Sequence, residues 1–518
     1  MPALRNVCRS AIGAGLAIAT LGAAQTPPNP AAVAAACREY RKAHEPAILA
    51  ELVNLLAIPN IASDAANIRR NADLLKAMLE RRSMTVRFLE IPGRGPAIFA
   101  QLTATGATRT LVFYAHYDGQ PVDPAAWTDT RPFEPALRTN AIEAGGVLRA
   151  MPDAATQTQD DWRLYARSAS DDKSPIVAML AALDALSARS IPRVVNLKVI
   201  LDSEEEAGSP HLEQVLASHR DLLTGDVLIT GDGPVHQSGR PLVFYGNRGI
   251  ADFNLTVYGP VRSLHSGHYG NWAPNPAMRL AQLLASMKDA DGRVLVKGFY
   301  DDVVPLSARE RKALDAMPAN DADLMRALQF GAPEGRGRKL VELINEPSLN
   351  IRGLRSASVG SESQNVVPDR ADASLDLRLV RNVDPLRQFE RVAAHIQAQG
   401  YFVVRDREPT ADERRAHAYV ARLDYGGGYP AARTDMDLPV SVAVAHALDE
   451  SLGGGLVLMP SLGGSAPMHL FERLGLPVIG VPIVNYDNGQ HAANENLRLG
   501  HFWRGIETYA ILLSALRW

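Results

Sequence analysis

Residues 111–118 read LVFYAHYD, an apolar run that ends in a histidine and, two positions later, an aspartate. The run is continuous rather than alternating, which is typical of a strand that helices cover on both faces. Residues 194–201, 227–230 and 478–484 form similar runs, and the spacing of apolar residues from 174 to 187 indicates a helix. The sequence therefore predicts an α/β domain with a mostly parallel sheet flanked by helices.

The middle of the chain follows another pattern. Residues 251–257 (ADFNLTV) and 373–379 (ASLDLRL) alternate apolar with polar side chains, which indicates strands of a sheet with one solvated face. Because a buried-strand pattern returns afterwards, we expect an inserted α+β domain at 249–429 between two parts of the catalytic domain, 25–248 and 430–518.

The glycine-rich stretch Tyr425–Pro430 is expected to be a linker at the end of the inserted domain. The stretch from Asp301 to Asn350 is polar and has only partly helical spacing, so we expect irregular structure with short helices there.

Residues 1–24 have the pattern of a secretory signal peptide. Arg5 and Arg9 precede an apolar run, Ala11–Ala24, that ends in small residues, so we expect cleavage near Ala24. The run is shorter than the roughly 20 residues of a membrane-spanning helix, which makes an uncleaved anchor the less favoured alternative. The predicted location is the periplasm or the outside of the cell, with no stable membrane insertion after cleavage.

The composition excludes several other classes of protein. Hydrophobic residues make up 46% and charged residues 21%, which is ordinary for a globular protein. The net charge is -3 without long blocks of one sign, so no nucleic-acid partner is expected. The chain has no G-x-S-x-G, H-E-x-x-H or P-loop pattern, which disfavours a serine hydrolase, a single-zinc protease and a nucleotide-driven enzyme.

Side chains that can bind a metal follow each of the four apolar runs. They are His116, the triplet Glu204–Glu206, Asp232 and His491, and Asp171 lies just before the predicted helix at 174–187. In an open α/β sheet, ligands bind at the carboxyl ends of the strands, so these residues are expected to share one site. Taken singly, each is more often an ordinary surface or core residue.

The predicted set of donors is two imidazoles and three carboxylates, without sulfur. Such a set suits Zn²⁺ best, with Mn²⁺ or Co²⁺ as alternatives. Five ligands exceed what one catalytic zinc with an open position uses, and they fit two divalent metal ions that share a carboxylate. In an extended segment, Asp118 lies on the same side as His116, where it can hold the second imidazole nitrogen.

At these residues the sequence resembles the M20 metallopeptidase family, which includes carnosinase-type dipeptidases, glutamate carboxypeptidase, and the acetylornithine and succinyl-diaminopimelate deacylases. The resemblance covers nearly all of residues 40–518 and rests on seven motifs in order. These motifs are Ala115–Asp118, Ser170–Lys173, Glu205–Ser209, Gly231–Gly233, Leu264–Gly267, Gly463–Pro467 and His491–Glu495.

The resemblance implies the fold of the binuclear zinc exopeptidases and a division of labour among the donors. By this analogy His116 and Asp232 bind one metal, Glu206 and His491 bind the other, and Asp171 bridges them. The resemblance also implies that Asp118 supports His116, that Glu205 is the general base, and that the Asp171–Asp172 peptide bond is cis.

The inserted domain acquires its expected role from the same resemblance. It implies a lid and dimerisation domain, a homodimer, and a His265 that reaches the reaction site, across the dimer in several family members. Arg378 and Ser465 are implied to hold a substrate carboxylate, which suits the bidentate geometry of a guanidinium. Without the resemblance, Arg378 reads as a charge on the surface of a strand.

The sequence thus predicts an exported binuclear metallohydrolase that cleaves a peptide or amide bond next to a free carboxylate. A dipeptidase or carboxypeptidase acting on small peptides is favoured, because Lys297–Val303 and the chain length resemble the dipeptidase branch. The alternatives are a deacylase of N-acyl amino acids and, in a different class, a non-catalytic metal- or peptide-binding protein of the same fold.

One departure from the family concerns the loop around Asp171. Residues 166–174 lack the glycines that family members often have there. Because residues other than glycine rarely adopt positive φ angles, we expect this loop to run differently and the neighbouring pocket to be narrower.

Overall fold

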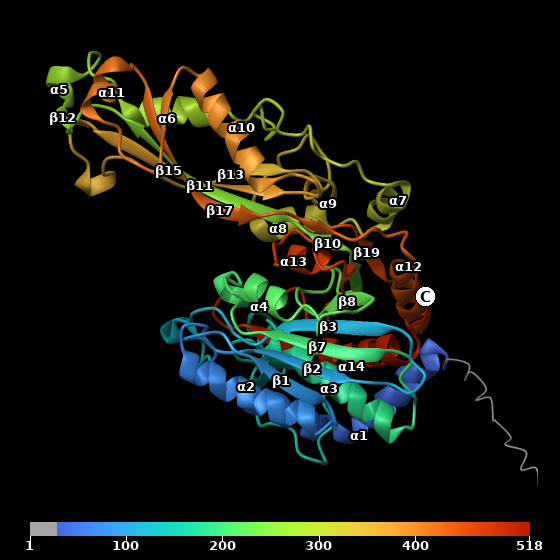
Figure 1. The fold of residues 1–518 in the computed structure, drawn as a ribbon. Coiled ribbons are helices and arrows are strands. Elements are labelled where there is room, and N and C mark those ends of the chain that lie inside the picture. The colour runs from blue at the N-terminus through green and yellow to red at the C-terminus, as the bar shows by residue number, and fades with distance from the viewer. Residues whose placement is uncertain (1–27) are drawn as a thin grey trace, which may run out of the picture.

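The computed structural model describes residues 28–518, so the predicted signal peptide lies outside the described residues. Figure 1 shows two bodies, one built on an eight-stranded sheet and the other on a five-stranded sheet. The larger sheet has the strand order β1-β2-β7-β3-β8-β20-β9-β19. In that order the strands are Thr85–Leu89, Ala97–Leu102, Asn196–Asp202, Thr110–His116, Val227–Thr230, Val478–Gly480, Leu242–Phe244 and Val457–Met459.

The centre of the eight-stranded sheet is parallel, as the continuous apolar runs predict. Strand β3 pairs in parallel with β7 and β8, and β20 pairs in parallel with β8. Leu111, Phe113 and Ala115 of β3 face one apolar cluster, whereas Val112 and Tyr114 face another on the opposite side. Both faces are therefore buried, which is why the run does not alternate.

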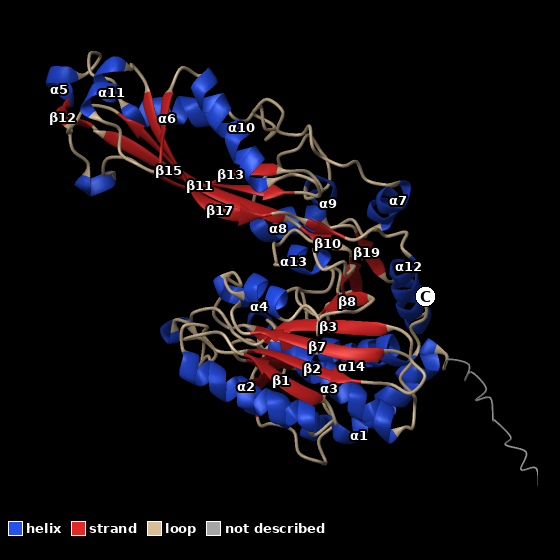
Figure 2. Cartoon of the chain, viewed as in Figure 1, coloured by secondary structure: helices blue, strands red, loops and turns tan. Residues whose placement is uncertain are grey.

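Helices cover both faces of this sheet (Figure 2). The first cluster contains residues of α1, α2, α3, α12 and α14, and the second contains residues of α4 and α13. These helices are Pro30–Leu56, Ala65–Glu80, Lys173–Ala188, Pro439–Leu452, Leu499–Ser514, Leu212–Ser218 and His469–Glu472, respectively. The predicted fold class, a largely parallel sheet flanked by helices, is confirmed.

The second body is the antiparallel sheet β13-β15-β11-β17-β16, in which only β16 pairs in parallel. Its strands are Ser348–Arg355, Arg370–Leu379, Gly249–Tyr258, Val420–Tyr429 and Phe402–Arg405. Helices α6 (Pro276–Ala285) and α10 (Pro385–Ala398) pack with it in one apolar cluster, as the alternating strand patterns predict. The division of the chain into domains stays a prediction.

The far tip of the second body is built from short elements: β12 (Leu264–His265), α5 (Ser266–Tyr269), β14 (Val366–Val367) and α11 (Ala411–Ala416). Figure 1 places this tip at the end remote from the eight-stranded sheet. The polar stretch at 301–350 forms three short helices, α7 (Ala308–Ala316), α8 (Asp321–Leu328) and α9 (Leu340–Leu343). Leu314 of α7 packs against β9 and β19, so this stretch joins the two bodies.

The remaining strands form small sheets near the larger body. β21, β6, β4 and β5 make a four-stranded sheet, and β10 pairs with β18. Their bounds are Asn496–Arg498, Arg163–Tyr165, Ala136–Arg138, Leu148–Arg149, Gly246–Asn247 and Ala432–Arg433. Within residues 28–518, no helix combines the length and the apolar character that crossing a membrane requires.

Two local predictions were wrong. The expected linker at Tyr425–Pro430 is largely strand, because β17 extends to Tyr429 and its Gly428 lies opposite Ala251 of β11. A Cβ at Gly428 would come within 2.4 Å of the Ile250 carbonyl oxygen, so glycine here permits close pairing rather than a flexible joint. The run at 478–484 forms a strand only to Gly480, since Pro482 has no N–H to donate to a ladder.

Candidate metal centre

The five predicted metal ligands converge at the carboxyl ends of the parallel strands. His116 is the last residue of β3, Asp232 follows β8 by two residues, and Glu206 lies in the single turn Glu205–Ala207 after β7. Since these strands are parallel and in register, their carboxyl ends meet at one edge of the sheet.

The donors form two groups that share one residue. His116, Asp171 and Asp232 form the first, and Asp171, Glu206 and His491 form the second. Within each group, one ligand atom per residue lies within 4.8 Å of the others. The two oxygens of Asp171 face different imidazoles: Oδ1 is 2.9 Å from His116 Nε2, and Oδ2 is 3.2 Å from His491 Nε2. The geometry therefore allows this carboxylate to bridge two cations.

Asp118 organises both sides of this arrangement. Its Oδ1 lies 3.3 Å from His116 Nδ1, which leaves Nε2 directed at Asp171. Its carboxylate also accepts the backbone N–H groups of Glu205 at 3.1 Å and Glu206 at 3.0 Å. One buried carboxylate thus fixes the orientation of an imidazole and the turn that carries two glutamates.

The three glutamates point in different directions. Glu204 turns away, with its Oε2 2.7 Å from His211 Nδ1. Glu206 Oε2 lies 3.2 Å from His491 Nε2 and accepts a hydrogen bond from Gln120. Glu205 belongs to neither donor group and lines the cavities beside them. The neighbours in sequence therefore occupy distinct chemical positions.

Electrostatics supports the fit of cations to these donors. Burial raises the pKa of Asp232 to about 6, and the negative charge of Asp171 adds to the shift. Burial also raises the pKa of Glu205 well above its usual range, with Asp232 and Asp171 contributing. Hydrogen bonds to Asp171 and Glu206 raise the pKa of His491 to about 10. Buried carboxylates in such excess favour bound positive charge, and the oxygen and nitrogen donors suit divalent metals.

The loop that carries Asp171 is held by the completely buried Glu495. Its carboxylate accepts the backbone N–H groups of Ser168, Ser170 and Asp171 at 2.9 to 3.0 Å and pairs with Arg167 at 2.7 Å. The Asp171–Asp172 peptide bond is cis, as the resemblance implies.

The loop reaches a positive φ without a glycine, whereas its different course and a narrower pocket stay predictions. Ser168 adopts φ 61° without being glycine. Its backbone N–H bonds to Glu495 and its hydroxyl accepts from Asn60, and these contacts stabilise the left-handed conformation.

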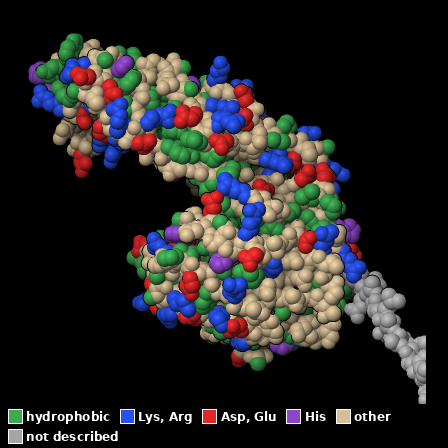
Figure 3. Space-filling view, viewed as in Figure 1, with side chains coloured by type: hydrophobic (Ala, Val, Ile, Leu, Met, Phe, Trp, Pro, Cys, Tyr) green, Lys and Arg blue, Asp and Glu red, His purple; other side chains and the backbone are tan. Residues whose placement is uncertain are grey.

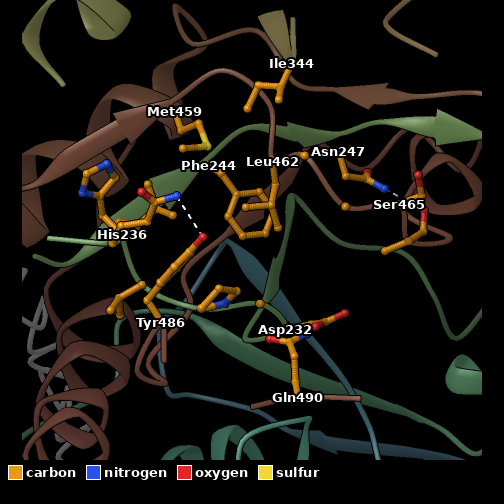
Figure 4. A pocket seen from close by; sticks show the side chains of 18 of the residues that line it. Asp232, His236, Phe244, Asn247, Ile344, Met459, Leu462, Ser465, Tyr486 and Gln490 are labelled. Atoms are coloured by element: carbon orange, nitrogen blue, oxygen red, sulfur yellow. Dashed lines mark hydrogen bonds between the residues drawn. The ribbon is translucent and has the colours of Figure 1, made fainter. Parts of the chain in front are cut away.

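Two cavities open beside the donors. The larger, of about 560 Å³, is lined by Asp171, Glu205, Asp232 and His491 and also by Arg378 and Ser465. Figure 4 shows Asp232 and Gln490 on one side of it and Ser465 on another. Arg378 Nη1 donates to Ser465 Oγ at 2.7 Å, so the two predicted carboxylate-binding residues lie together. A second cavity, of about 410 Å³, shares Glu205, Ser465 and His491 with the first.

His265 is the one predicted site residue that the chain does not bring to this centre. It lies in β12 at the far tip of the second body, its side chain is exposed, and it lines neither cavity. The surface between the two bodies is hollowed and open on the face shown in Figure 3. The Nδ1 atom of His265 accepts a hydrogen bond from the backbone N–H of Gly267.

Three polar residues at the site were missed by sequence reasoning. Gln120 bonds to Glu206 and Gln490 bonds to Asp171, and both lie within two residues of recognised motifs, which is a usable signal. Asn247 lines the larger cavity while only 3% exposed. Its Oδ1 has no hydrogen-bond partner among the described residues, so it is available to a ligand donor, and no pattern in the sequence marks it.

Comparisons with known proteins agree with this geometry. The sequence profile of Peptidase family M20/M25/M40 matches residues 112–515. The human Beta-Ala-His dipeptidase is 27% identical over 80% of this chain and 76% of its own length. The Cys-Gly metallodipeptidase DUG1 of Candida albicans is 23% identical over 90% of this chain and 93% of its own.

Solved structures show the same fold. An M20 family metallo-carboxypeptidase from Sulfolobus solfataricus superposes with a TM-score of 0.72 at 28% identity, covering 90% of this chain and 98% of that one. Human carnosine dipeptidase 1 superposes with a TM-score of 0.70 at 23% identity, covering 94% of this chain and 99% of that one. The chain belongs to the M20/M25/M40 peptidase family and is an amide-bond hydrolase.

Proposed function

We propose that this protein is a dipeptidase or carboxypeptidase that uses two divalent metal ions to hydrolyse a peptide bond next to a free carboxylate. The observation that carries the proposal is one cavity that combines two donor groups, joined through Asp171, with the adjacent pair Arg378 and Ser465. The names of the relatives, which refer to β-Ala-His and Cys-Gly, support small peptides as substrates.

The metal ions would be held by His116 and Asp232 on one side, Glu206 and His491 on the other, and Asp171 between them. Bound there, two divalent cations supply a water molecule of lowered pKa and polarise the scissile carbonyl. Zn²⁺ suits these donors best, with Mn²⁺ and Co²⁺ as alternatives.

Glu205 is proposed as the general base. Its carboxylate lines both cavities, belongs to neither donor group, and is held by the turn that Asp118 fixes. From this position it accepts a proton from the attacking water and delivers it to the departing amine nitrogen. Positive charge in the adjacent donor groups favours the ionised form of Glu205, which a base requires.

Arg378 and Ser465 are proposed to bind the carboxylate of the substrate. The guanidinium offers parallel N–H donors to two carboxylate oxygens, and the Ser465 hydroxyl adds a third donor beside it. Glu205 lines the same cavity as Arg378, which supports hydrolysis of bonds near a free carboxy terminus.

His265 is proposed to act from a second copy of the chain. An exposed imidazole at the tip of the second body can donate to the developing oxyanion in a partner's site, which makes a homodimer part of this proposal. Export also belongs here, because it rests on the pattern of residues 1–24.

The test combines metal analysis with a substrate panel. Elemental analysis of the purified protein should give two divalent ions per chain, and unblocked dipeptides should be hydrolysed faster than N-acetyl or N-succinyl amino acids. Robust hydrolysis of the acylated series with no cleavage of dipeptides would overturn the peptidase assignment in favour of a deacylase.

A further inference from the structure

One end of the larger cavity is apolar. It is formed by Phe244 of β9, Met459 of β19, Leu462 in the loop after β19, and Ile344, which directly follows α9. Figure 4 shows these four side chains gathered across the cavity from Asp232. The cavity therefore has a reactive end and an apolar end.

The side chains of the apolar end are held in place by packing. Phe244 and Met459 are 3% and 8% exposed and belong to a buried cluster, against which the half-buried Ile344 and Leu462 pack. The Phe244 ring lies over Gly480, where a Cβ would come within 2.0 Å of the ring. Because the ring is seated this closely, the shape of the wall is set by packing and not by mobile side chains.

The polar side chains at this end are bonded to one another. Asn320 donates to the Gln237 carboxamide oxygen, and Gln237 in turn donates to the Tyr486 hydroxyl at 2.9 Å. His236 Nδ1 is 2.8 Å from Ser238 Oγ. A polar group of a ligand would lose its hydration here without gaining a hydrogen-bond partner, because these side chains already bond to protein groups. An apolar group of a ligand would instead be stabilised by burial.

The apolar end and Arg378, which is proposed to bind the carboxylate, line the same cavity. Arg378 lines the larger cavity, together with Phe244 and Ile344, and it is not among the residues that line the smaller cavity. A substrate whose carboxylate is held by Arg378 therefore has its terminal residue in the larger cavity. The side chain of that residue has the apolar wall as its neighbour.

We propose that the preferred substrates are peptides whose carboxy-terminal residue has a large apolar side chain, such as Leu, Ile or Phe. This side chain packs against Phe244, Ile344, Met459 and Leu462. The proposal rests on the proposed function and narrows its substrate class. It also separates this chain from the relatives whose names refer to dipeptides that end in Gly or His.

The experiment measures kcat/KM of the metal-loaded, full-length protein on Ala-Leu, Ala-Phe, Ala-Gly and Ala-Asp. Ala-Leu and Ala-Phe should exceed Ala-Gly by at least roughly tenfold, because burial of the larger side chain contributes to transition-state binding. Ala-Asp should be the poorest substrate. Equal or faster hydrolysis of Ala-Gly would overturn the inference and leave the proposed function intact.

A variant tests whether the apolar side chains of the cavity cause the preference for a large carboxy-terminal side chain. Ile344→Ala should lower kcat/KM for Ala-Leu by roughly tenfold and change that for Ala-Gly by less than roughly twofold. The matched control is Leu328→Ala in α8, an exposed residue outside the cavity, which should change neither. Near-UV circular dichroism of the same sample reports whether the variant is folded, and an equal loss on both substrates by a folded variant would contradict the role of Ile344.

A parallel series separates failure of this inference from failure of the proposed function. If no dipeptide is hydrolysed, N-acetyl-Leu and N-acetyl-Gly test the same wall with a deacylase. A preference for N-acetyl-Leu then supports the apolar wall while the peptidase assignment is wrong. No hydrolysis of either series with Zn²⁺, Mn²⁺ or Co²⁺ would reject both.

Discussion

His116 and His265 are both assigned to the reaction by the resemblance, yet they lie in opposite surroundings. His116 is completely buried at the end of β3, and each of its ring nitrogens faces a carboxylate. His265 is exposed at the tip of the second body, and its Nδ1 bonds only to the next turn of its own loop. The fold of one chain therefore places the first histidine at the metal centre, whereas it leaves the second exposed and away from both cavities.

The two histidines separate the metal-binding part of the site from the proposed oxyanion-binding part. The metal-binding half of the site depends on parallel strands whose carboxyl ends meet, and this is a property of a single chain. In the proposed function, the oxyanion-binding half depends on how two chains meet. The variants below probe this division, beginning with the largest expected effect.

Glu205→Gln tests the half that one chain completes. We expect kcat to fall by roughly 10²- to 10⁴-fold, because the amide cannot accept a proton, while both metal ions remain bound. Steady-state kinetics and elemental analysis on the same sample measure the two quantities. Glu204→Gln is the matched control, since Glu204 bonds to His211 away from the donors, and it should retain most of the activity. Unchanged turnover in Glu205→Gln would refute the assigned base.

His265→Ala tests the proposed oxyanion-binding part of the site. We expect kcat to fall by roughly 10²- to 10³-fold without loss of metal, because one donor to the oxyanion is removed. Val261→Ala, at an exposed position shortly before β12, should have little effect and serves as the control.

Mixing the two inactive variants tests whether His265 acts across a dimer. If His265 acts across a dimer, exchange of Glu205→Gln and His265→Ala chains should restore about a quarter of the wild-type rate, because each mixed dimer has one intact site. A mixture as inactive as its components would show that Glu205 and His265 act in the site of the same chain. His265 would then not act across a dimer.

Glu495→Gln tests how firmly the chain itself holds Asp171. Because the amide offers one oxygen in place of a charged pair, we expect metal affinity to fall by roughly 10- to 100-fold. Competition with a chelator of known affinity measures this change. Glu507→Gln, which alters another buried carboxylate paired with an arginine, Arg38, but remote from the donors, is the control and should leave affinity unchanged. Unaltered affinity in Glu495→Gln would mean that the loop holds its shape without the carboxylate.

The smallest effect concerns another buried histidine, His501 of α14. Burial and the charges of Arg504 and Arg498 lower its pKa to about 3, so it stays neutral in the folded protein while the unfolded chain binds a proton below about pH 6.5. Stability is therefore complete above that pH and is lost as the pH falls, by about 1.4 kcal/mol per pH unit from this residue.

Urea unfolding of wild type and His501→Gln at pH 7 and pH 5 isolates this contribution. The variant should lose about 2 kcal/mol less than wild type over that interval. His268→Gln changes an exposed histidine and is the reference. A wild-type loss no larger than that of His501→Gln would show that His501 accepts its proton without unfolding.

The sequence allowed the fold and most of the donors to be predicted, because both depend on local patterns. Continuous apolar runs mark the buried strands, and His116, Glu206 and Asp232 come directly after three of them. The positive φ of Ser168 could not be predicted, because it is stabilised by Glu495, which is remote in the sequence. The apolar wall was missed for a similar reason, since Ile344 lies in a polar stretch and meets Phe244 only through tertiary packing.

The contacts of Glu495 have a consequence for how the enzyme is made. Asp171 is synthesised 324 residues before Glu495, whose carboxylate shapes its loop, and His491 also comes far later in the chain. A chain still attached to the ribosome, with these residues inside the exit tunnel, has strands β3, β7 and β8 but no second donor group. If activity needs both donor groups, as proposed, the nascent protein is therefore silent toward peptides until Glu495 and His491 have joined the fold.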